Sequence, residues 1–449
     1  MPTQRPAPLA APTVRRGRYV RVRTKFLVSL GGAVAWMILS VWLSLPWVRD
    51  LAEASNAVLA VTVVTLVAYV PGGVVAFLAI SLVLDRQPPM TAPSPTTPVS
   101  VIVAARNEAA GIATTLRYLA DQDYEGHVHV LLADNGSTDG TGDVARDAAS
   151  ALGLSLSVVT EPRPGKSHAL NSALARVATG LVVTLDADTL LHRSALRSIV
   201  GRLESAPADV VAVAGSMLAR NSREGFWARM QEWDYFLGIA SVKRMQGLYQ
   251  GTLVAQGAFS LYRTDAVRDV GGWPDAIGED IVVTWHLLAR RGRVYFEPLA
   301  LAFTDVPVTL RHLAVQRARW ARGMLEGLRA VPPWRQRSRM ARALTGLDVV
   351  IPLLDVGYTF VWMPGLVLAL FGHYWVVGPW TLFVLPLTLL VNVLLYRFQR
   401  RRVFDPLGLK VRRNPLGFVT YVLLYQMVMS PVAVWGYAQE VVGARRRWK

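Results

Sequence analysis

Cysteine is absent from the 449-residue sequence, which excludes disulfide bonds, thiolate metal sites and S-palmitoylation. Histidine is scarce, and the spacing of His168, His192, His286 and His312 does not match that of metal ligands. A G-x-G-x-x-G pattern is missing after the first predicted strand, so a dinucleotide-binding domain is not expected. The chemistry of this chain is therefore sought among its carboxylates and its remaining cations.

Acidic residues are outnumbered, 31 against 48 basic residues, which gives a formal net charge of +17. One interpretation of such an excess is nucleic-acid binding, which would need a basic groove in a soluble module. Hydrophobic residues make up 52% of the chain, and the cationic residues mostly flank its apolar segments. We therefore expect no nucleic-acid partner, and interpret the charge as orienting the protein and contacting anionic membrane lipid.

Two apolar segments near the N-terminus, residues 26–48 and 57–84, are each long enough to cross a bilayer. Basic residues precede the first segment, so the positive-inside rule places the N-terminal tail in the cytoplasm. The second segment then returns the chain to the cytoplasm. A signal peptide is the alternative, because Ala52-Glu53-Ala54 resembles a cleavage site, but the first apolar run is too long for one.

Three more apolar segments follow in the C-terminal part, at residues 349–371, 379–396 and 417–442. The loop 397–414 is rich in arginine and is expected to be internal. Five spans would place the basic C-terminal tail outside, against the charge rule. The alternative is that Pro431 and Gly436 break the last segment so that it turns back, but we favour five spans.

Between the two apolar groups, a proline-rich stretch reads as a linker, and strand and helix patterns then alternate. The predicted strands are Val99–Ala104, Val128–Ala133, Ser155–Thr160 and Gly180–Leu185, and the helices between them are Gly111–Asp121, Thr138–Leu152 and Lys166–Ala178. Such βαβ units imply an α/β domain with a mostly parallel sheet covered by helices on both faces.

The expected organisation in chain order is a cytoplasmic basic tail (1–25), two transmembrane helices (26–86), a linker (87–98), a cytoplasmic α/β domain (99–330), an interfacial helix (331–348), three transmembrane helices (349–442) and a basic tail (443–449).

Asp186 and Asp188 end a run of apolar, β-branched residues, Leu181–Leu185, that is typical of a buried parallel strand. Ligands of open α/β sheets bind just beyond the carboxyl ends of such strands. Two carboxylates there are suitable ligands for Mg²⁺ or Mn²⁺, ions that usually accompany a diphosphate. The alternative is an ordinary turn at the end of a strand.

Polar residues also follow the other predicted strands, among them Glu108, Asp134 and Lys166. Because these strand ends share one edge of the sheet, we expect their side chains to line one crevice. A cation for the diphosphate, a pair of metal ligands and a further carboxylate are the groups that a nucleotide-diphosphate site needs.

Two later clusters add to this set. Glu279 and Asp280 open a predicted helix, Ile281–Arg290, whose dipole favours their ionised forms, although a plain helix cap would look the same. Gln316, Arg319 and Trp320 lie in an arginine-rich helix, for which a basic helix on the membrane surface is the alternative.

In this order the motifs resemble those of the membrane-embedded, processive glycosyltransferases of family 2, which include cellulose, hyaluronan, chitin and poly-N-acetylglucosamine synthases. The pattern of that family is D, DxD, [TG]ED and Q-x-x-R-W, matched here by Asp134, Asp186/Asp188, Glu279-Asp280 and Gln316/Arg319/Trp320. Residues 277–288 and 297–329 look most similar to bacterial poly-β-1,6-N-acetylglucosamine synthases. Gln256 departs from the pattern, because relatives often have a small residue there, and it is expected to alter the acceptor site.

The resemblance implies a GT-A type domain and a role for each matched residue. Ala104 and Glu108 would cradle the base and ribose, Asp134 would accept the uracil N–H, and Lys166 would pair with the diphosphate. Asp186 would contact the nucleotide and Asp188, with Asp186, the metal ion. Glu279 and Asp280 would form the catalytic acid pair, with Asp280 as general base, and Gln316, Arg319 and Trp320 would hold the diphosphate and the sugar at the acceptor end.

The implied activity is an inverting, metal-dependent hexosyl transfer that polymerises a UDP-sugar, with UDP-N-acetylglucosamine as the best candidate, and extrudes the β-linked glycan across the plasma membrane. The growing glycan is the acceptor, and a small accessory membrane subunit is a further candidate partner. The alternative is single transfer to a polyprenyl phosphate or another lipid. A degenerate scaffold is disfavoured, because the acidic motifs and Arg319 are intact.

Overall fold

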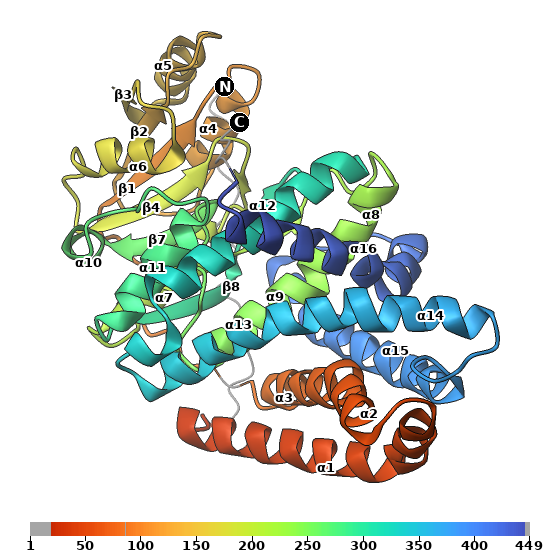
Figure 1. The fold of residues 1–449 in the computed structure, drawn as a ribbon. Coiled ribbons are helices and arrows are strands. Elements are labelled where there is room, and N and C mark those ends of the chain that lie inside the picture. The colour runs from red at the N-terminus through yellow and green to blue at the C-terminus, as the bar shows by residue number, and fades with distance from the viewer. Residues whose placement is uncertain (1–18, 86, 445–449) are drawn as a thin grey trace.

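The computed structural model describes residues 19–85 and 87–444. An α/β domain occupies one end of the molecule, and long helices from both ends of the chain lie side by side at the other (Figure 1). Parts of the two predicted basic tails, residues 1–18 and 445–449, and Arg86 lie outside the described residues.

The α/β domain is built on one eight-stranded sheet with the order β3-β2-β1-β4-β7-β6-β8-β5. Its strands are β1 (Val99–Ala105), β2 (Val128–Asp134), β3 (Ser155–Thr160), β4 (Leu181–Asp186), β5 (Leu190–Leu191), β6 (Val210–Ala219), β7 (Phe259–Arg263) and β8 (Arg293–Thr304). The first four strands are mutually parallel, and β7 and β5 run antiparallel to their neighbours. The predicted α/β class with a mostly parallel sheet is confirmed.

Helices cover both faces of this sheet: α4 (Ile112–Ala120), α5 (Thr141–Leu152), α6 (Lys166–Leu174), α7 (Ala195–Glu204), α10 (Thr264–Asp269) and α11 (Glu279–Ala289). Successive residues of β1 point to opposite faces, so Val101 and Val103 belong to one hydrophobic core and Ile102 to the other. Both sets are fully buried, which explains why these strands read as continuous apolar runs.

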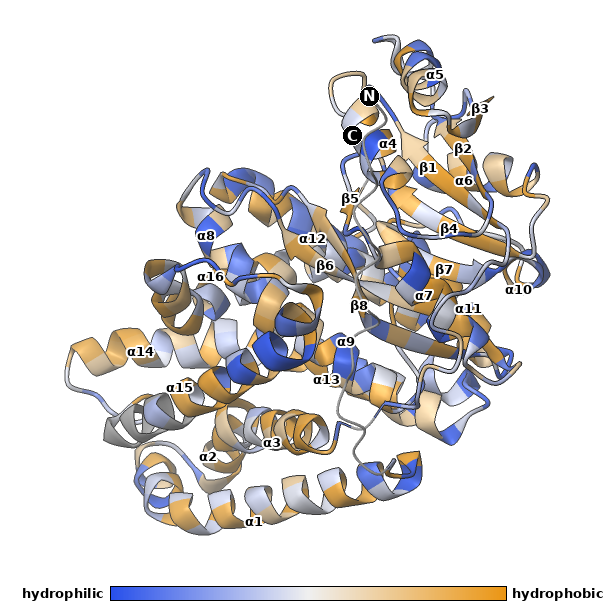
Figure 2. Cartoon of the chain, turned by 180° about the vertical axis from the view of Figure 1, so that it is seen from behind, coloured by the Kyte–Doolittle hydropathy of each residue, from blue (hydrophilic) through white to orange (hydrophobic). Residues whose placement is uncertain are grey.

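Four helical segments of the described residues are long and apolar enough to cross a membrane: Val22–Ala54, Ala57–Val83, Arg339–Leu370 and Pro415–Val441. The first segment is α1 and the fourth is α16 (Pro415–Val441). The second comprises α2 (Ala57–Val64), η1 (Thr65–Tyr69) and α3 (Val70–Val83). The third comprises α13 (Arg339–Gly357), η4 (Tyr358–Trp362) and α14 (Met363–Leu370). Figure 2 colours the hydrophobic residues along these helices orange. The remaining predicted segment, 379–396, is helical as α15 (Pro379–Gln399), but most of its first side chains lie outside the described set.

One detail of these helices differs from expectation, and another agrees with the favoured reading of an unbroken last segment. The expected interfacial helix 331–348 is not a separate element, because α13 begins at Arg339 and runs on into the apolar segment without a break; only the short 3-10 turn η3 (Pro333–Arg335) precedes it. Gly436 does not break α16. A Cβ there would lie 2.5 Å from the carbonyl oxygen of Ala318, so the glycine permits close packing on α12 (Leu310–Ala330).

Three elements join the sheet to the apolar helices: α8 (Phe226–Trp233) with η2 (Asp234–Ile239), α9 (Ala240–Leu248) and α12. Helices α8 and α12 pack on α16, and α9 packs between β8 and α3. A buried ion pair adds to this junction, with Arg244 Nη2 on α9 lying 2.6 Å from Oδ2 of Asp85, just beyond α3. The two parts of the molecule therefore share a packed, partly ionic interface.

Candidate active site

The carboxyl ends of three parallel strands meet at one edge of the sheet. The strand register pairs Ala104 with Asp186 and Ala105 with Asp134, so β1, β2 and β4 end at the same level. Asp134 Oδ1 accepts a hydrogen bond of 3.0 Å from the backbone N–H of Ser137, which holds the carboxylate in the loop after β2. The predicted gathering of polar groups at this edge therefore follows from the backbone alone.

Lys166, at the start of α6, links two of the predicted acidic motifs. Its Nζ donates a hydrogen bond to Asp186 and lies 3.8 Å from Oε1 of Glu279. Burial acts to lower the pKa of Lys166, but the charges of Asp186 and Glu279 outweigh it and raise the pKa above its usual range. The amine is therefore a permanent cation at physiological pH.

Asp188 and Glu108 are two carboxylates of this region that form no ion pair with a cation among the described residues. Burial, reinforced by the charge of Asp186, raises the pKa of Asp188 to about 6. Burial and then the charge of Asp188 also raise the pKa of Glu108. Glu108, in the loop after β1, is therefore near enough to Asp188 for the two charges to interact. A positive charge bound here would relieve both carboxylates.

Among the described residues, groups of three or more side chains arranged to hold a metal ion are not found. Two carboxylates are nevertheless the usual protein contribution to a Mg²⁺ site, because substrate phosphates and water supply the other ligands. The residues present thus fit a divalent ion that arrives with a diphosphate, with Asp186 and Asp188 as its protein ligands.

Glu279 and Asp280 form the first turn of α11. Burial raises the pKa of Glu279 to about 7, with Lys166 opposing and Asp280 adding to the shift. Asp280 Oδ1 accepts the N–H of Ile281 at 2.9 Å, and Oδ2 accepts the N–H of Gly257 at 3.2 Å. These bonds fix the Asp280 carboxylate at the wall of the site.

Gly257 lies close to both the ammonium of Lys166 and the carboxylate of Glu279. A Cβ at this position would lie 2.9 Å from Nζ of Lys166 and 3.4 Å from Oε1 of Glu279. Glycine here leaves room for the lysine ammonium beside the acids, and a larger residue would displace it.

Gln316, Arg319 and Trp320 lie on α12, and the side chain of Trp320 is 37% exposed. The guanidinium carbon of Arg317 lies 4.1 Å from the centre of the Trp320 ring, so one face of the indole already carries a cation. Gln316 Oε1 is buried and has no hydrogen-bond partner among the described atoms, which leaves an acceptor available to a ligand.

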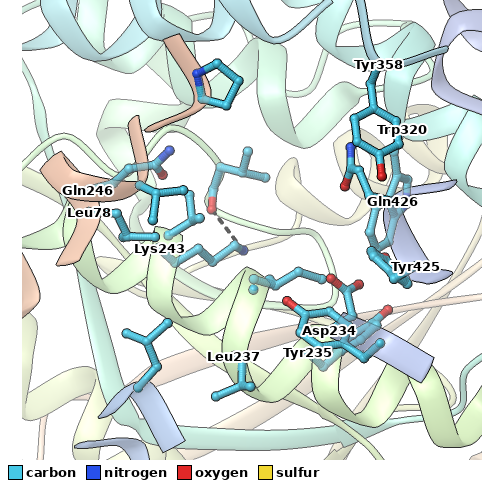
Figure 3. Close-up of a pocket in the computed structure, with 18 of the residues that line it drawn as sticks. Leu78, Asp234, Tyr235, Leu237, Lys243, Gln246, Trp320, Tyr358, Tyr425 and Gln426 are labelled. Atoms are coloured by element: carbon cyan, nitrogen blue, oxygen red, sulfur yellow. Dashed lines mark hydrogen bonds between the residues drawn. The ribbon is translucent and has the colours of Figure 1, made fainter. Parts of the chain in front are cut away.

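A single cavity of about 2600 Å³ connects most of these groups. The predicted residues that line it are Lys166, Asp186, Asp188, Glu279, Asp280, Gln316, Arg319 and Trp320. Of the predicted set, Ala104, Glu108 and Asp134 are not among its lining residues, and lie instead at the neighbouring strand ends. The cavity continues between the apolar helices, where aromatic and amide side chains such as Tyr358, Tyr425 and Gln426 face it (Figure 3).

Sequence reasoning missed several polar residues of the same cavity. Asp234 in η2 accepts a hydrogen bond of 2.7 Å from Arg317, and Lys243 in α9 projects into the space in Figure 3. Glu326 does not line the cavity and was also missed; it accepts the N–H groups of Ile277 and Gly278 and so anchors the loop before Glu279. The one available signal was the charge of Asp234 inside an otherwise apolar helical segment; Lys243 is followed directly by Arg244 and gave no such signal.

The chain is similar in sequence and in fold to known glycosyltransferases. The family described as "Glycosyltransferase like family 2" matches residues 95–323. The poly-beta-1,6-N-acetyl-D-glucosamine synthase of Staphylococcus aureus (strain COL) is 32% identical over 226 residues, covering 50% of this chain and 54% of the relative. The Staphylococcus epidermidis synthase is 30% identical over the same length. The chain thus spans about half the length of the curated relatives it matches.

Among solved structures, the mannosyltransferase PcManGT from Pyrobaculum calidifontis, in complex with GDP-Man and Mn²⁺, superposes with a TM-score of 0.55 at 20% identity, covering 95% of this chain and 100% of that one. This likeness supports the GT-A fold expected from the sequence. Because the family match extends over half of the sequence, the chain belongs to glycosyltransferase-like family 2.

Proposed function

We propose that the chain is an inverting, metal-dependent membrane glycosyltransferase that polymerises UDP-N-acetylglucosamine into a β-linked polysaccharide and passes it across the membrane. The observation that carries this proposal is the shared cavity, which runs from Asp188 and Asp280 past Trp320 into the space between the apolar helices. The choice of N-acetylglucosamine comes from the likeness to the staphylococcal synthases.

The proposed reaction is a direct displacement at the anomeric carbon of the donor. The acceptor oxygen forms a bond to this carbon, the bond to the UDP oxygen breaks, and the hydroxyl proton passes to Asp280. Lys166 and Arg319 stabilise the charge that develops on the departing diphosphate. A divalent ion held by Asp186 and Asp188 would supply further Lewis-acid stabilisation of the same group, as it does in similar sites.

The residues that hold the nucleotide are assigned from their place at the strand ends. Asp134, Ala104 and Glu108 follow the edge of the sheet away from the cavity, where the uridine of a donor would lie if its diphosphate contacted Lys166. The acceptor sugar would then lie between Asp280 and Trp320, stacked on the free face of the indole.

We further propose that the apolar helices cross the plasma membrane several times, with the catalytic domain on the cytoplasmic side, where UDP-sugars are made. A glycan is too polar to cross lipid unaided, and the aromatic and amide groups between the helices offer it a path. Transfer of one sugar to a polyprenyl phosphate is the second candidate, since the same cavity opens between membrane helices.

The deciding experiment incubates membranes that contain the full chain with separate radiolabelled UDP-sugars, followed by digestion with linkage-specific hydrolases. We expect incorporation from UDP-N-acetylglucosamine into a ladder or smear of long products that a β-1,6-specific hydrolase degrades. EDTA should abolish incorporation, and Mg²⁺ or Mn²⁺ should restore it. One lipid-linked product would instead support the polyprenyl-phosphate reaction.

A further inference from the structure

Lysine is rare in this chain, and two of the few lysines line the same cavity. Arginine supplies nearly all of the positive charge, whereas the lysines are Lys25, Lys166, Lys243, Lys410 and Lys449. Lys166 contacts Asp186 and Glu279, as described above. Lys243 has no carboxylate oxygen within 4.0 Å of its Nζ among the described residues, although it lies on the buried helix α9 and lines the cavity. It is therefore a cation without a counter-charge in direct contact.

The ammonium of Lys243 is held in place by neutral groups. It donates one hydrogen bond of 3.3 Å to the carbonyl oxygen of Val254 and another to Oε1 of Gln256. The amide of Gln256 is fixed in turn, because its Nε2 donates a bond of 2.9 Å to the carbonyl oxygen of Gly215. An ammonium has three donors, so one remains for a group inside the cavity (Figure 3).

This cation lies close to the group that would activate the acceptor. Gln256 is followed directly by Gly257, whose N–H donates to Asp280. Burial lowers the pKa of Lys243 to about 8, and the charge of Asp280 is the one opposing influence on it. An acceptor hydroxyl placed at Asp280 would therefore bring the substituents of its sugar ring within reach of Lys243.

The surroundings of Lys243 indicate which ligand group would accept its remaining hydrogen bond. A buried ammonium gains most from a ligand oxygen that carries negative charge or a strong dipole. A second ammonium in the same place would be repelled. Acetamido and carboxylate substituents both offer a carbonyl-type oxygen, whereas a free amino sugar offers a like charge.

We propose that Lys243, positioned by Gln256, determines acceptor specificity by donating a hydrogen bond to a carbonyl-type oxygen on the terminal sugar of the acceptor. This inference rests on the proposed function. It explains why the chain has glutamine at position 256: the amide orients the lysine without neutralising it.

The test uses the full chain reconstituted in lipid, with UDP-N-acetylglucosamine as donor and short oligosaccharide acceptors. The acceptors end in N-acetylglucosamine, in glucuronic acid or in glucosamine, and UDP release is measured for each. We expect the wild type to use at least one of the first two about 10- to 100-fold better than the third, the range that a charged hydrogen bond supplies. The preferred acceptor shows whether Lys243 binds an acetamido oxygen or a carboxylate oxygen.

Lys243→Met should reduce this preference to a few fold, by raising KM for the acceptor while leaving KM for the donor unchanged. Lys410→Met is the matched control, because Lys410 is exposed and does not line the cavity, and it should keep the preference. Gln256→Glu is a second variant of nearly unchanged size. It gives Lys243 a permanent carboxylate partner and should also weaken the preference.

Equal use of all three acceptors by the wild type would overturn the inference while leaving the proposed function intact. A preference that persists in both Lys243→Met and Gln256→Glu would overturn it as well. The absence of any product from the donor in the wild type would instead refute the proposed function, and the inference with it.

Discussion

Asp280 combines the two properties that a general base at this site needs, a fixed carboxylate and a position in the wall of the cavity. We predict that Asp280→Asn lowers sugar transfer by about 10²- to 10⁴-fold, because the amide cannot take the acceptor proton. UDP binding, measured by calorimetry, should remain intact.

The control is Asp265→Asn, which makes the same chemical change at an exposed position on α10 and should leave both measurements unchanged. An equal loss of transfer and of UDP binding in Asp280→Asn would mean that this residue maintains the structure of the site.

Lys243 also makes a prediction about stability. Its pKa is about 8 in the folded chain and about 10.5 in the unfolded chain, so between these values the unfolded state binds more protons. Stability therefore rises with pH across this window, and the full penalty of the buried charge is present below pH 8. We predict that Lys243→Met raises the thermal unfolding temperature at pH 7, and that this gain shrinks as the pH approaches 10.

Thermal unfolding in detergent at several pH values checks this expectation, with Lys410→Met as the reference. A gain that does not change with pH would mean that the side-chain volume, and not the charge, is responsible. If removing the lysine stabilises the protein, the residue is retained for function and not for stability.

At the scale of secondary structure, the sequence predicted the catalytic half well because its signals are local. β3 has the predicted bounds, and β1, β2 and β4 differ from their predicted bounds by one residue. The strand-end motifs then converge because parallel strands share an edge. The half with the long apolar helices was less predictable. The start of α13 at Arg339 depends on Ser338, whose Oγ accepts the N–H of Ala341, and this cap was not recognised.

The participation of η2 and α9 in the cavity could not be predicted, because it depends on how these helices pack between β8 and α3. Nothing in the local sequence around Lys243 indicates that Val254 and Gln256 will lie against it. The contact of Glu326 with the loop before Glu279 was missed for the same reason, since 48 positions separate Glu326 from Gly278.

A polar cluster joins two of the apolar helices. Asp355 on α13 accepts hydrogen bonds from Ser430 at 2.6 Å and from Tyr437 at 2.8 Å, both on α16. We predict that Tyr437→Phe lowers the free energy of unfolding by about 0.6–1.7 kcal/mol, the range found for hydrogen bonds between membrane helices. Chemical unfolding in detergent measures this loss.

A double-mutant cycle with Asp355→Leu, which removes the acceptor oxygens, should recover most of that energy as coupling between the two positions. Tyr118→Phe, at an exposed position on α4, should have no effect. Additive losses in the cycle would contradict a direct bond between Asp355 and Tyr437.

At the scale of the whole molecule, the ion pair between Arg244 and Asp85 joins the catalytic domain to the N-terminal helices. Its side chains are 4% and 2% exposed, so removing one partner strands a charge in the interior. We predict that Arg244→Leu destabilises the protein by about 3–5 kcal/mol. Thermal unfolding and the yield of folded protein in detergent measure the effect.

The double variant Arg244→Leu/Asp85→Leu should recover much of the lost stability, because two apolar side chains can replace a buried pair at small cost. Arg229→Leu, which removes an arginine at a partly exposed position of α8, is the comparison. If the double variant is as unstable as Arg244→Leu alone, the stranded charge is not the cause.

Helix α12 packs on two neighbours through close contacts between backbone atoms. Gly323 lies directly against Gly278, where an added Cβ would approach the neighbouring Cα to 2.8 Å, and Ala318 meets Gly436 on the other side. Backbone atoms in direct contact cannot adjust as flexible side chains do, so a movement of one element displaces the other. If α16 crosses the bilayer as we propose, a tilt of this helix is expected to shift Arg319 and Trp320 relative to Asp280, and the rate of sugar transfer should then depend on the surrounding lipid.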